Sequence, residues 1–525
     1  MNLSRADHRV SPPRVEIPRD YNAAHDLLER NAGRSAKVAF VDALSGATLS
    51  YGELAEQSHC FANALRAQGF PPESRILLAM LDTPEWPVAF LGCILAGVVP
   101  VAANTLLTTR DFDFMLRDSR AQGLIVSKAL LPAFEPLIAQ IPTLRTVITA
   151  GDDSESDTAL AQMVRAQPAT KTIATTCADD ACFWLYSSGS TGTPKGTVHL
   201  HSHLIQTAEL YGRGVLGIRE SDVVYSAAKL FFAYGLGNGL TFPMSVGATA
   251  VLLPARPTPA EVFGILKKHQ PTIFYGVPTL YAAMLADPAR PQKSELRLRV
   301  CTSAGEALPA EIGKKWTAQY GCDILDGIGS TEMLHIFLSN RPGEVRYGTT
   351  GKAVPGYELR IVGDDGQDCG TGEIGELQIS GPSSALMYWN SRAKTKATFA
   401  GDWTRSGDKY TVDADGYYTY SGRSDDMLKV GGIYVSPFEV EACLMTHPSV
   451  LEVAVIGMLD ADELVKPKAC VVLKAGQTAS SDELKAHVKL HLAAYKYPRW
   501  IEFVPELPKT ATGKIQRFKL RQSRN

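Results

Sequence analysis

The sequence predicts an α/β protein: a large N-terminal domain of layered α/β sheets plus a β-rich subdomain, followed by a small α+β C-terminal domain. Three observations support this prediction. Helix-like and strand-like patterns alternate between about residues 21 and 302, as in layers with substantially parallel sheets. From residue 357 hydrophobic residues alternate more strictly between Gly and Asp turns. Beyond residue 426 helices and strands mix again.

The N-terminal alternation contains one long amphipathic helix, predicted over residues 51–67 with Ser50 as its N-cap. The most apolar stretch, residues 88–103, is shorter than the ~20 residues of a membrane helix and contains Pro100. It is therefore predicted as a buried helix that leads into a strand. Further strands are predicted at residues 75–80, 124–126, 146–150, 181–186, 272–275 and 298–302.

The β-rich subdomain and the C-terminal domain meet at a break near residues 422–426. Before this break, strands are predicted at residues 359–362, 376–380 and 416–421. After it, a helix is predicted at 439–445, strands at 450–457 and 469–473, and a helix at 481–492. We therefore expect two domains, residues 1–422 and 423–525.

Composition limits the class of protein. Its 53 basic and 55 acidic residues nearly cancel, so nothing marks nucleic acid or an anionic membrane as the main partner. Nine cysteines without CxxC pairs argue against a disulfide framework, show no zinc-type spacing with His, and indicate reduced thiols in a cytoplasm. The polar N-terminus lacks the apolar core of a signal peptide. We expect a cytoplasmic protein.

The most informative segment is a turn-rich one. Residues 186–196 read Tyr-Ser-Ser-Gly-Ser-Thr-Gly-Thr-Pro-Lys-Gly and follow the apolar run 181–186. A strand that opens into such a loop offers backbone N–H groups and hydroxyls to an anion, and Lys195 adds a positive charge. This is the chemistry of a phosphate cradle, but not of a Walker A loop, because Gly196 follows Lys195. A mobile Ser/Gly loop without a ligand is the alternative.

This segment resembles the signature loop of the AMP-forming acyl-CoA synthetase superfamily, the adenylate-forming enzymes. Each further motif has a structural alternative such as a turn, a helix cap, a linker or a basic tail. Six motifs in the family's order, however, identify the chain as a member over nearly its whole length. The other five are Ser303-Ala-Gly-Glu-Ala307, Asp326-Gly-Ile-Gly-Ser-Thr-Glu332, Ser406-Gly-Asp408, Gly422-Arg-Ser-Asp-Asp-Met-Leu-Lys-Val-Gly-Gly432 and Pro508-Lys-Thr-Ala-Thr-Gly-Lys-Ile-Gln-Arg517.

The resemblance implies a nucleotide site. Thr331 would contact the AMP phosphate and Glu332 would hold Mg²⁺, a hard cation that takes one or two carboxylates plus phosphate oxygens. Asp408 and Arg423 would bind the ribose, and Ile328 replaces a Tyr of the family motif. The implied ATP- and AMP-binding residues are Ser187, Ser188, Gly189, Ser190, Thr191, Gly192, Lys195, Gly305, Glu306, Ala307, Asp326, Gly327, Ile328, Thr331, Asp408 and Arg423.

The resemblance also implies that the C-terminal domain is mobile and that its hinge is at Asp425. Lys514 would be catalytic together with Thr331 and Glu332, because an ammonium can bridge a carboxylate oxygen and an α-phosphate oxygen. Small residues near the hinge would let a thiol arm pass close to the backbone. The implied coenzyme A tunnel consists of Lys429, Gly431 and Gly432.

The implied reaction has two halves and uses ATP, Mg²⁺ and coenzyme A. A carboxylate attacks the α-phosphate of ATP, pyrophosphate leaves, and acyl-AMP forms. Rotation of the small domain then withdraws Lys514 and brings residues 429–432 toward the site. A thiol attacks the acyl carbon, and AMP leaves.

The acid is predicted to be benzoate or a small substituted benzoate. Residues 327–336 and 346–356 look closest to the benzoate-CoA ligases. The implied ring contacts are Ala233, Tyr234, Gly329, His335 and Ile336, with a structural helix histidine as the alternative for His335. Phe232 stands where many relatives carry His, which puts the gating role of that position in doubt.

Three other functions stay open. A medium-chain fatty acid ligase would need a tunnel beyond Gly329. An aryl acid adenylation enzyme would load a carrier protein in place of free coenzyme A. A non-enzymatic ATP-binding module is the third, and intact Lys514 and Glu332 argue against it. The partners are therefore expected to be small molecules, with no nucleic acid or membrane, and a homodimer is left open.

Overall fold

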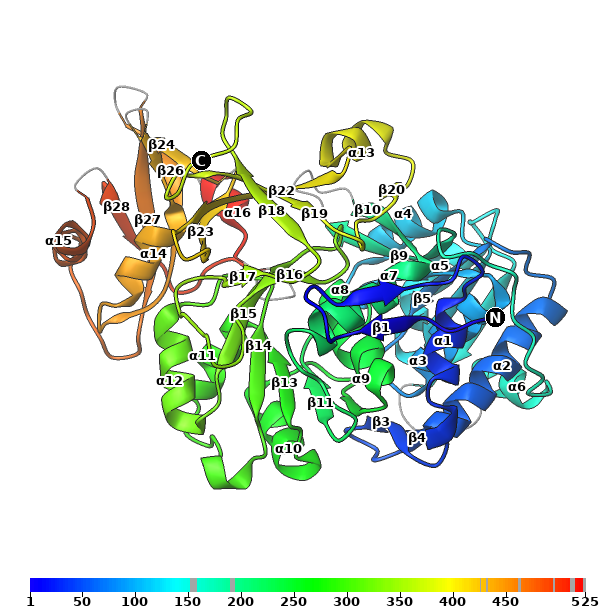
Figure 1. The fold of residues 1–525 in the computed structure, drawn as a ribbon. Coiled ribbons are helices and arrows are strands. Elements are labelled where there is room, and N and C mark those ends of the chain that lie inside the picture. The colour runs from blue at the N-terminus through cyan, green and yellow to red at the C-terminus, as the bar shows by residue number, and fades with distance from the viewer. Residues whose placement is uncertain are drawn as a thin grey trace.

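The computed structural model describes residues 1–151, 158–188, 194–424, 426–430, 433–460, 464–493, 496–509 and 515–522. For residues 188, 429, 433, 434, 518 and 522 only the backbone is described. Two α/β layers form the larger part, and the C-terminal elements lie at the opposite end of the molecule from the N-terminal helices (Figure 1).

The first α/β layer is a seven-stranded sheet in the order β20-β10-β9-β6-β5-β7-β8. Its strands from β9 to β8 are parallel, whereas β10 runs antiparallel to β9. The strands are β5 (Arg75–Ala79), β6 (Val99–Ala102), β7 (Gly123–Ser127), β8 (Thr146–Ala150), β9 (Ala181–Ser188), β10 (Pro194–Leu200) and β20 (Met387–Tyr388). The helices of this part are α2 (Tyr51–Ala67), α3 (Glu85–Ala96), α4 (Thr109–Ser119), α5 (Leu131–Ile138) and α6 (Ala159–Arg165).

The second layer is a nine-stranded sheet in the order β17-β16-β15-β14-β13-β11-β12-β3-β4. It is parallel from β3 to β15, and β16 then turns back antiparallel. The strands are β3 (Val38–Asp42), β4 (Thr48–Ser50), β11 (Val223–Ser226), β12 (Thr249–Leu252), β13 (Ile273–Gly276), β14 (Val300–Ser303), β15 (Ile324–Gly329), β16 (Ile336–Ser339) and β17 (Lys352–Ala353). The consecutive parallel strands β12 to β15 are connected by helices α10 (Pro259–His269), α11 (Pro278–Ala286) and α12 (Ala310–Tyr320).

One hydrophobic core joins the two sheets. It contains Ile76 from the first sheet, Val224 from the second, and Ile205 and Phe242 from the short helices between them. These helices are α1 (Ala23–Glu29), α7 (His201–Thr207), α8 (Ala233–Leu236) and α9 (Phe242–Val246), with π-helical turns at Ala208–Arg213 and Gly237–Thr241. Elsewhere in the chain, 3₁₀ turns are formed by Ala32–Arg34, Lys128–Leu130 and Lys293–Glu295.

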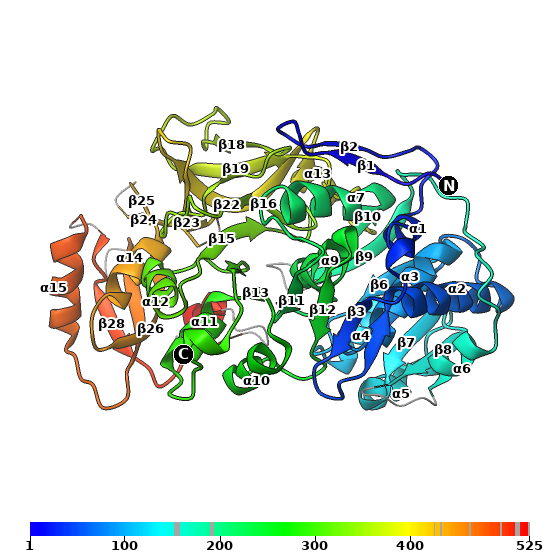
Figure 2. The same cartoon turned by 60° about the horizontal axis from the view of Figure 1, so that its bottom comes forward.

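The β-rich subdomain is an antiparallel sheet of β18 (Glu358–Val362), β19 (Gly375–Ser380), β21 (Phe399–Ala400), β22 (Trp403–Val412) and β23 (Tyr418–Arg423). Helix α13 (Arg392–Thr398) precedes β21, and a hairpin of β1 (Arg5–Asp7) and β2 (Arg14–Glu16) lies near this sheet (Figure 2).

The C-terminal part has hydrophobic clusters of its own, which include Val440, Val455, Val471 and Leu484. Its three-stranded sheet has the order β26-β27-β28, and β24 pairs with β25. The elements are β24 (Leu428–Val430), β25 (Ile433–Val435), α14 (Pro437–Met445), β26 (Val450–Leu459), β27 (Val465–Leu473), α15 (Ser481–His491), β28 (Trp500–Phe503) and α16 (Arg517–Gln522).

The structure confirms the predicted fold class and most element positions. Ser50 caps α2 in a capping box with Glu53, and the apolar stretch 88–103 divides into α3 and β6. Of the described helices, none combines the length and apolarity that a membrane span requires. One boundary differs: strand β9 continues to Ser188 and β10 begins at Pro194, because these residues pair in an antiparallel ladder. Both ends of the turn-rich segment 186–196 therefore belong to strands.

Candidate active site

The Ser303–Ala307 motif and the Asp326 motif lie side by side on neighbouring strands. Parallel strands β14 and β15 pair with Ser303 opposite Asp326, where β14 and the parallel ladder between the two strands end. Ser303 Oγ and Asp326 Oδ1 are buried and have no hydrogen-bond partner among the described residues. Buried polar atoms are normally satisfied, and ligands of open α/β sheets bind at the carboxyl ends of strands. The two atoms therefore fit contacts with a polar ligand.

The environment of Asp326 disfavours its charge. Burial raises the pKa of this carboxyl well above its usual value, although the backbone N–H groups of Leu308 and Gly327 oppose the shift. Gly305, in the turn after β14, has φ +93°, a conformation that favours glycine. Glu306 and Ala307 follow in the same turn, and Ile328 packs against the main core from β15.

Lys195 and Glu332, from two different motifs, meet at one tyrosine. Lys195 Nζ lies 4.0 Å from Glu332 Oε1 and 3.2 Å from the Tyr388 hydroxyl, above whose ring it sits at 4.2 Å. The Tyr388 hydroxyl donates to Glu332 Oε1 at 2.6 Å. Burial lowers the pKa of Lys195, and the Glu332 charge opposes that shift. This cluster presents one cation and one carboxylate, the groups that a phosphate and a divalent cation need.

Tyr388 was not predicted from the sequence. It belongs to the two-residue strand β20, which pairs with β10 through Thr197 and Val198 and so lies near Lys195. Nothing in the short stretch Met387–Tyr388 marks it as functional.

A buried histidine supports the backbone of Thr331. His199 on β10 donates its Nε2–H to the Thr331 carbonyl at 2.8 Å, and its Nδ1 lies 3.1 Å from His203 Nδ1. Burial lowers the pKa of His199 to about 4, so the ring is neutral at pH 7. The sequence prediction missed this residue, although His199, His201 and His203 form a visible alternation.

The two predicted ribose-binding residues are neighbours. Asp408 on β22 pairs in register with Arg423 at the end of β23, and the Arg423 guanidinium donates to Asp408 Oδ1 at 3.1 Å. The same Nη1 donates to the Ser406 carbonyl. Gly407 lies in between with φ +70°, and a Cβ there would approach Arg423 Nη2 at 2.9 Å. The glycine therefore allows the guanidinium to lie against the strand.

The predicted acyl-site residues also come together. The Tyr234 hydroxyl lies 2.5 Å from Thr302 Oγ1, and the Tyr234 and His335 rings are 5.5 Å apart. His335 Nε2 lies 3.1 Å from Asn238 Oδ1, and burial lowers the pKa of His335 to about 3. The imidazole is therefore neutral at pH 7 and is fixed in place from several sides. Ala233 begins α8 beside Tyr234.

Contact with the neighbouring backbone leaves no room for a side chain at Gly329. It pairs with Ile336 across the β15–β16 turn, and a Cβ at Gly329 would lie only 2.5 Å from the His335 carbonyl oxygen. Even the smallest side chain would therefore force the turn apart. Ile336 is 1% exposed and closes the same region with an apolar side chain.

Several predicted residues lie outside the described part of the chain: Gly189, Ser190, Thr191, Gly192, Asp425, Gly431, Gly432 and Lys514. The neighbouring residues are described. Ser187, whose buried Oγ has no hydrogen-bond partner among the described residues, pairs with Lys195, and Ser188 pairs with Pro194. Lys429 lies in β24. Lys509 and Ile515, on either side of residues 510–514, form an isolated β-bridge.

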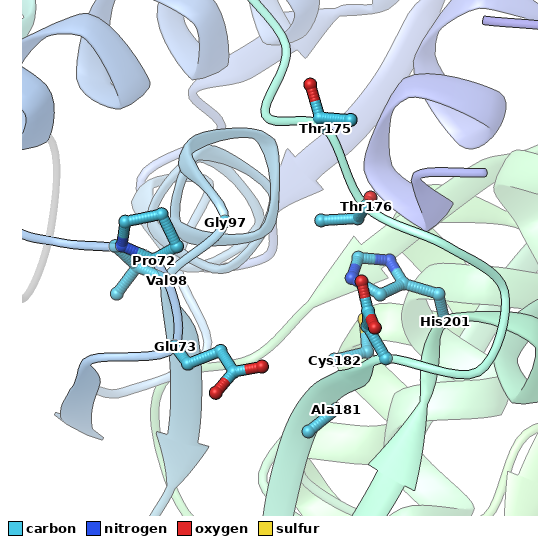
Figure 3. A pocket seen from close by; sticks show the side chains of 10 residues that line it. Pro72, Glu73, Gly97, Val98, Thr175, Thr176, Ala181, Cys182 and His201 are labelled. Atoms are coloured by element: carbon cyan, nitrogen blue, oxygen red, sulfur yellow. The ribbon is translucent and has the colours of Figure 1, made fainter. Parts of the chain in front are cut away.

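A separate cavity of about 310 Å³ lies away from these motifs (Figure 3). Its lining includes Glu73, Gly97, Asp180, Cys182 and His201, and none of the predicted site residues. His201 Nδ1 accepts the Ala23 N–H at 3.1 Å. This histidine is thus a packing residue of the core.

Comparison with known proteins gives a consistent result. The sequence profile described as "AMP-binding enzyme" matches residues 27–389, and "AMP-binding enzyme C-terminal domain" matches residues 439–514. The chain is 60% identical over 528 residues to a benzoate--CoA ligase of Thauera aromatica, with 99% of each chain covered. It is 52% identical to the 4-hydroxybenzoate--CoA/benzoate--CoA ligase of Rhodopseudomonas palustris, with 96% of this chain and 94% of the other covered.

Solved structures agree. A benzoate CoA ligase from Burkholderia xenovorans LB400 superimposes with a TM-score of 0.89 at 54% identity, covering 95% of this chain and 100% of the other. The anthranilate CoA ligase AuaEII, solved with anthranoyl-AMP, gives 0.91 at 45% identity, covering 97% and 98%.

Proposed function

Because this chain belongs to the family of AMP-binding enzymes, we propose that it is an ATP-dependent, AMP-forming benzoate–CoA ligase. The observation that carries the proposal is 60% identity over 99% of both chains to a benzoate--CoA ligase. The substrates are benzoate or a small substituted benzoate, ATP and coenzyme A, with Mg²⁺ as the metal cofactor. The fatty-acid and carrier-protein alternatives are not favoured by these relatives.

The first half-reaction forms acyl-AMP. A benzoate oxygen attacks the α-phosphorus, the bond from that phosphorus to the bridging oxygen breaks, and pyrophosphate leaves with the electron pair. The protein contributes positioning and charge rather than covalent chemistry. Lys195 would hold phosphate oxygens, and Glu332, oriented by Tyr388, would hold Mg²⁺, which neutralises the triphosphate charge. His199 would keep the Thr331 backbone in position.

The second half-reaction transfers the acyl group. The thiol sulfur of coenzyme A attacks the acyl carbon, the bond to the AMP oxygen breaks, and the thiol proton is released. For this step we propose two domains, residues 1–422 and 423–525, that rotate about a hinge at Asp425. The coenzyme A tunnel would consist of Lys429, Gly431 and Gly432. Lys514 would be the catalytic lysine of the first half-reaction only.

A benzoate ring in this site would meet aromatic and apolar side chains. The Tyr234 and His335 rings, 5.5 Å apart, and Ile336 offer such a surface. A neutral imidazole at His335 favours an uncharged ring over a charged substituent. This supports a small aromatic acid over a long acyl chain.

The test is a competition assay. The protein is incubated with ATP, Mg²⁺, coenzyme A and equimolar benzoate, 4-hydroxybenzoate, anthranilate, cinnamate and octanoate, and thioesters are identified by mass. We expect benzoyl-CoA to dominate, with AMP as coproduct. Lys514→Ala should abolish acid-dependent pyrophosphate release, whereas the control Lys314→Ala, which loses an exposed contact to Glu311, should retain it. Octanoyl-CoA as the main product, or no thioester, would contradict the proposal.

Location and assembly are further parts of this proposal. All nine cysteines are free, which fits a reducing cytoplasm. A homodimer stays a prediction, which light scattering on the purified protein tests directly.

A further inference from the structure

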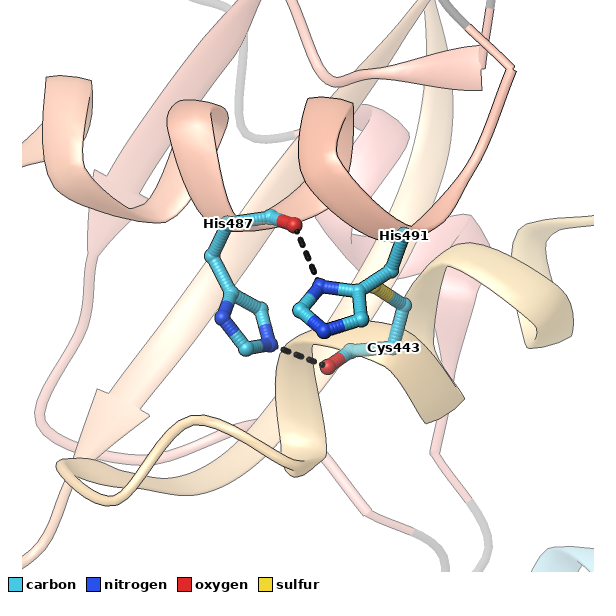
Figure 4. Close-up of side chains that lie close together, drawn as sticks. All are labelled: Cys443, His487 and His491. Atoms are coloured by element: carbon cyan, nitrogen blue, oxygen red, sulfur yellow. Dashed lines mark hydrogen bonds between the residues drawn. The ribbon is translucent and has the colours of Figure 1, made fainter.

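A cysteine and two histidines converge between helices α14 and α15 in the C-terminal part of the chain (Figure 4). Cys443 lies on α14, and His487 and His491 lie on α15. Residues four apart on a helix share one face, so the two imidazoles point to the same side. One ligand atom from each of the three residues lies within 4.8 Å of the others.

We propose that Cys443, His487 and His491 form a binding site for a thiolate-seeking divalent transition metal ion, with Zn²⁺ as the best match. A thiolate and two imidazoles are the ligands that Zn²⁺ prefers. Zn–N bonds of about 2.0–2.1 Å and Zn–S bonds of about 2.3 Å imply ligand separations of about 3.4–3.6 Å. Side-chain rotations that draw the ligand atoms about 1 Å closer would therefore assemble the site.

The surroundings of His491 suit a metal ligand. Its Nδ1 lies 2.8 Å from the His487 carbonyl oxygen, and since a carbonyl only accepts, Nδ1 must donate. The lone pair is then on Nε2. A ligating histidine usually donates its other N–H to such a group, which fixes the ring and its tautomer.

Two polar groups of α14 and its C-terminal end contact the His487 ring. Its Nε2 lies 3.2 Å from the Cys443 carbonyl oxygen and 2.8 Å from Thr446 Oγ1. Because a carbonyl only accepts, Nε2 donates in this arrangement. A metal at Nε2 would displace that proton to Nδ1 and replace these hydrogen bonds, so binding has a cost that the thiolate bond must exceed.

Protons compete with the metal at Cys443. The metal binds the thiolate form, so metal binding must release the thiol proton, and the affinity should rise with pH. His447, also nearby, accepts the Ser449 N–H at Nδ1 and faces Glu483 at 3.3 Å, so it is engaged elsewhere. Because His491 is exposed, water would complete the coordination.

Sequence spacing did not indicate this site. The two histidines are four residues apart, but Cys443 lies 44 residues before His487 and comes beside it only because α14 packs against α15. A bound ion would tie these two helices together on the surface of the C-terminal core, to which Leu444 and Val488 belong. The site is independent of the proposed ligase activity.

The experiment is a Co²⁺ titration of the full-length protein, freed of metal by a chelator, then desalted and kept reduced with a phosphine. We expect one equivalent of Co²⁺ to give a thiolate charge-transfer band and the visible bands of tetrahedral Co²⁺, and Zn²⁺ to remove both. Cys443→Ser should abolish the charge-transfer band. His491→Asn, at an exposed position, should weaken Co²⁺ binding by at least about tenfold.

Matched controls separate the site from general metal affinity. Cys369→Ser changes a half-buried cysteine and His269→Asn changes a histidine on α10, and both should leave the spectrum unchanged. Circular dichroism establishes that each variant is folded. Absence of a thiolate band in the unaltered protein, or its persistence in Cys443→Ser, would overturn the proposal.

Discussion

Replacing Tyr388 by Phe tests whether the Lys195–Glu332 pair is held by this tyrosine. The change removes a hydroxyl that donates to Glu332 Oε1 at 2.6 Å and lies 3.2 Å from Lys195 Nζ, and it leaves the ring in place. Without the hydroxyl, the carboxylate is free to close the 4.0 Å gap to Lys195. Lys195 and Glu332 would then form a direct ion pair, and both groups would be less available to the nucleotide and its metal ion.

The magnitude follows from the type of hydrogen bond. A hydrogen bond to a charged group contributes about 1.5–3 kcal/mol. If that energy is felt in the transition state, adenylation should slow by about 10- to 100-fold, since 1.4 kcal/mol corresponds to a factor of ten. The loss should appear in kcat/KM for ATP.

The assay separates the two half-reactions. Acid-dependent pyrophosphate release measures adenylation, and transfer from supplied benzoyl-AMP to coenzyme A measures the second step. We expect Tyr388→Phe to impair only the first. Tyr417→Phe, which removes a hydroxyl bonded to the Glu344 carbonyl, is the control and should behave like the unaltered protein. A rate of adenylation within twofold of normal in Tyr388→Phe would refute this reasoning.

Three further predictions concern packing, pH and the nucleotide. Gly329→Ala places a Cβ 2.5 Å from the His335 carbonyl oxygen, so it should lower the free energy of unfolding by about 1–3 kcal/mol and raise KM for benzoate, measured by denaturant titration and steady-state kinetics. An unchanged stability and KM would contradict it. Burial lowers the pKa of His199 from 6.5 to about 4, so the unfolded chain binds the proton more tightly, and stability is present above pH 6.5 and lost as pH falls toward 4. At pH 5 this histidine should lower the free energy of unfolding by about 2 kcal/mol relative to pH 7. His199→Gln should therefore make the free energy of unfolding depend less on pH. An unchanged dependence would contradict the low pKa of His199. Asp408→Asn weakens the partner of Arg423 and a predicted ribose acceptor, so KM for ATP should rise about tenfold with little change in KM for benzoate, and equal changes in both would argue against a ribose role.

The fold could be predicted from the sequence, because helix and strand patterns are local. Helix α2 could be placed from its apolar period and Ser50, and the second predicted ribose residue, Arg423, does lie opposite the first, Asp408. Strand ends were less certain, since pairing between Ser188 and Pro194 extends β9 and β10 into a segment whose composition favours a turn.

The partners of these residues could not be predicted, because long-range packing supplies them. Tyr388 lies 56 residues after Glu332 and reaches it through a strand of two residues, which leaves no periodic pattern. His199 contacts the Thr331 carbonyl across 132 residues. A motif states which side chains are present, whereas only the fold determines which hydrogen bonds hold them.

The state of Lys195 shows why these partners matter for the chemistry. Burial lowers the pKa of its ammonium, and Glu332 is the main group that restores it. A triphosphate would bring more negative charge than one carboxylate, so nucleotide binding should favour the protonated lysine and weaken its hold on Glu332. The carboxylate, still fixed by the Tyr388 hydroxyl, would then be available to Mg²⁺. We therefore expect nucleotide and metal to bind cooperatively here, and Tyr388→Phe to reduce that cooperativity in titrations of ATP at fixed Mg²⁺ concentrations.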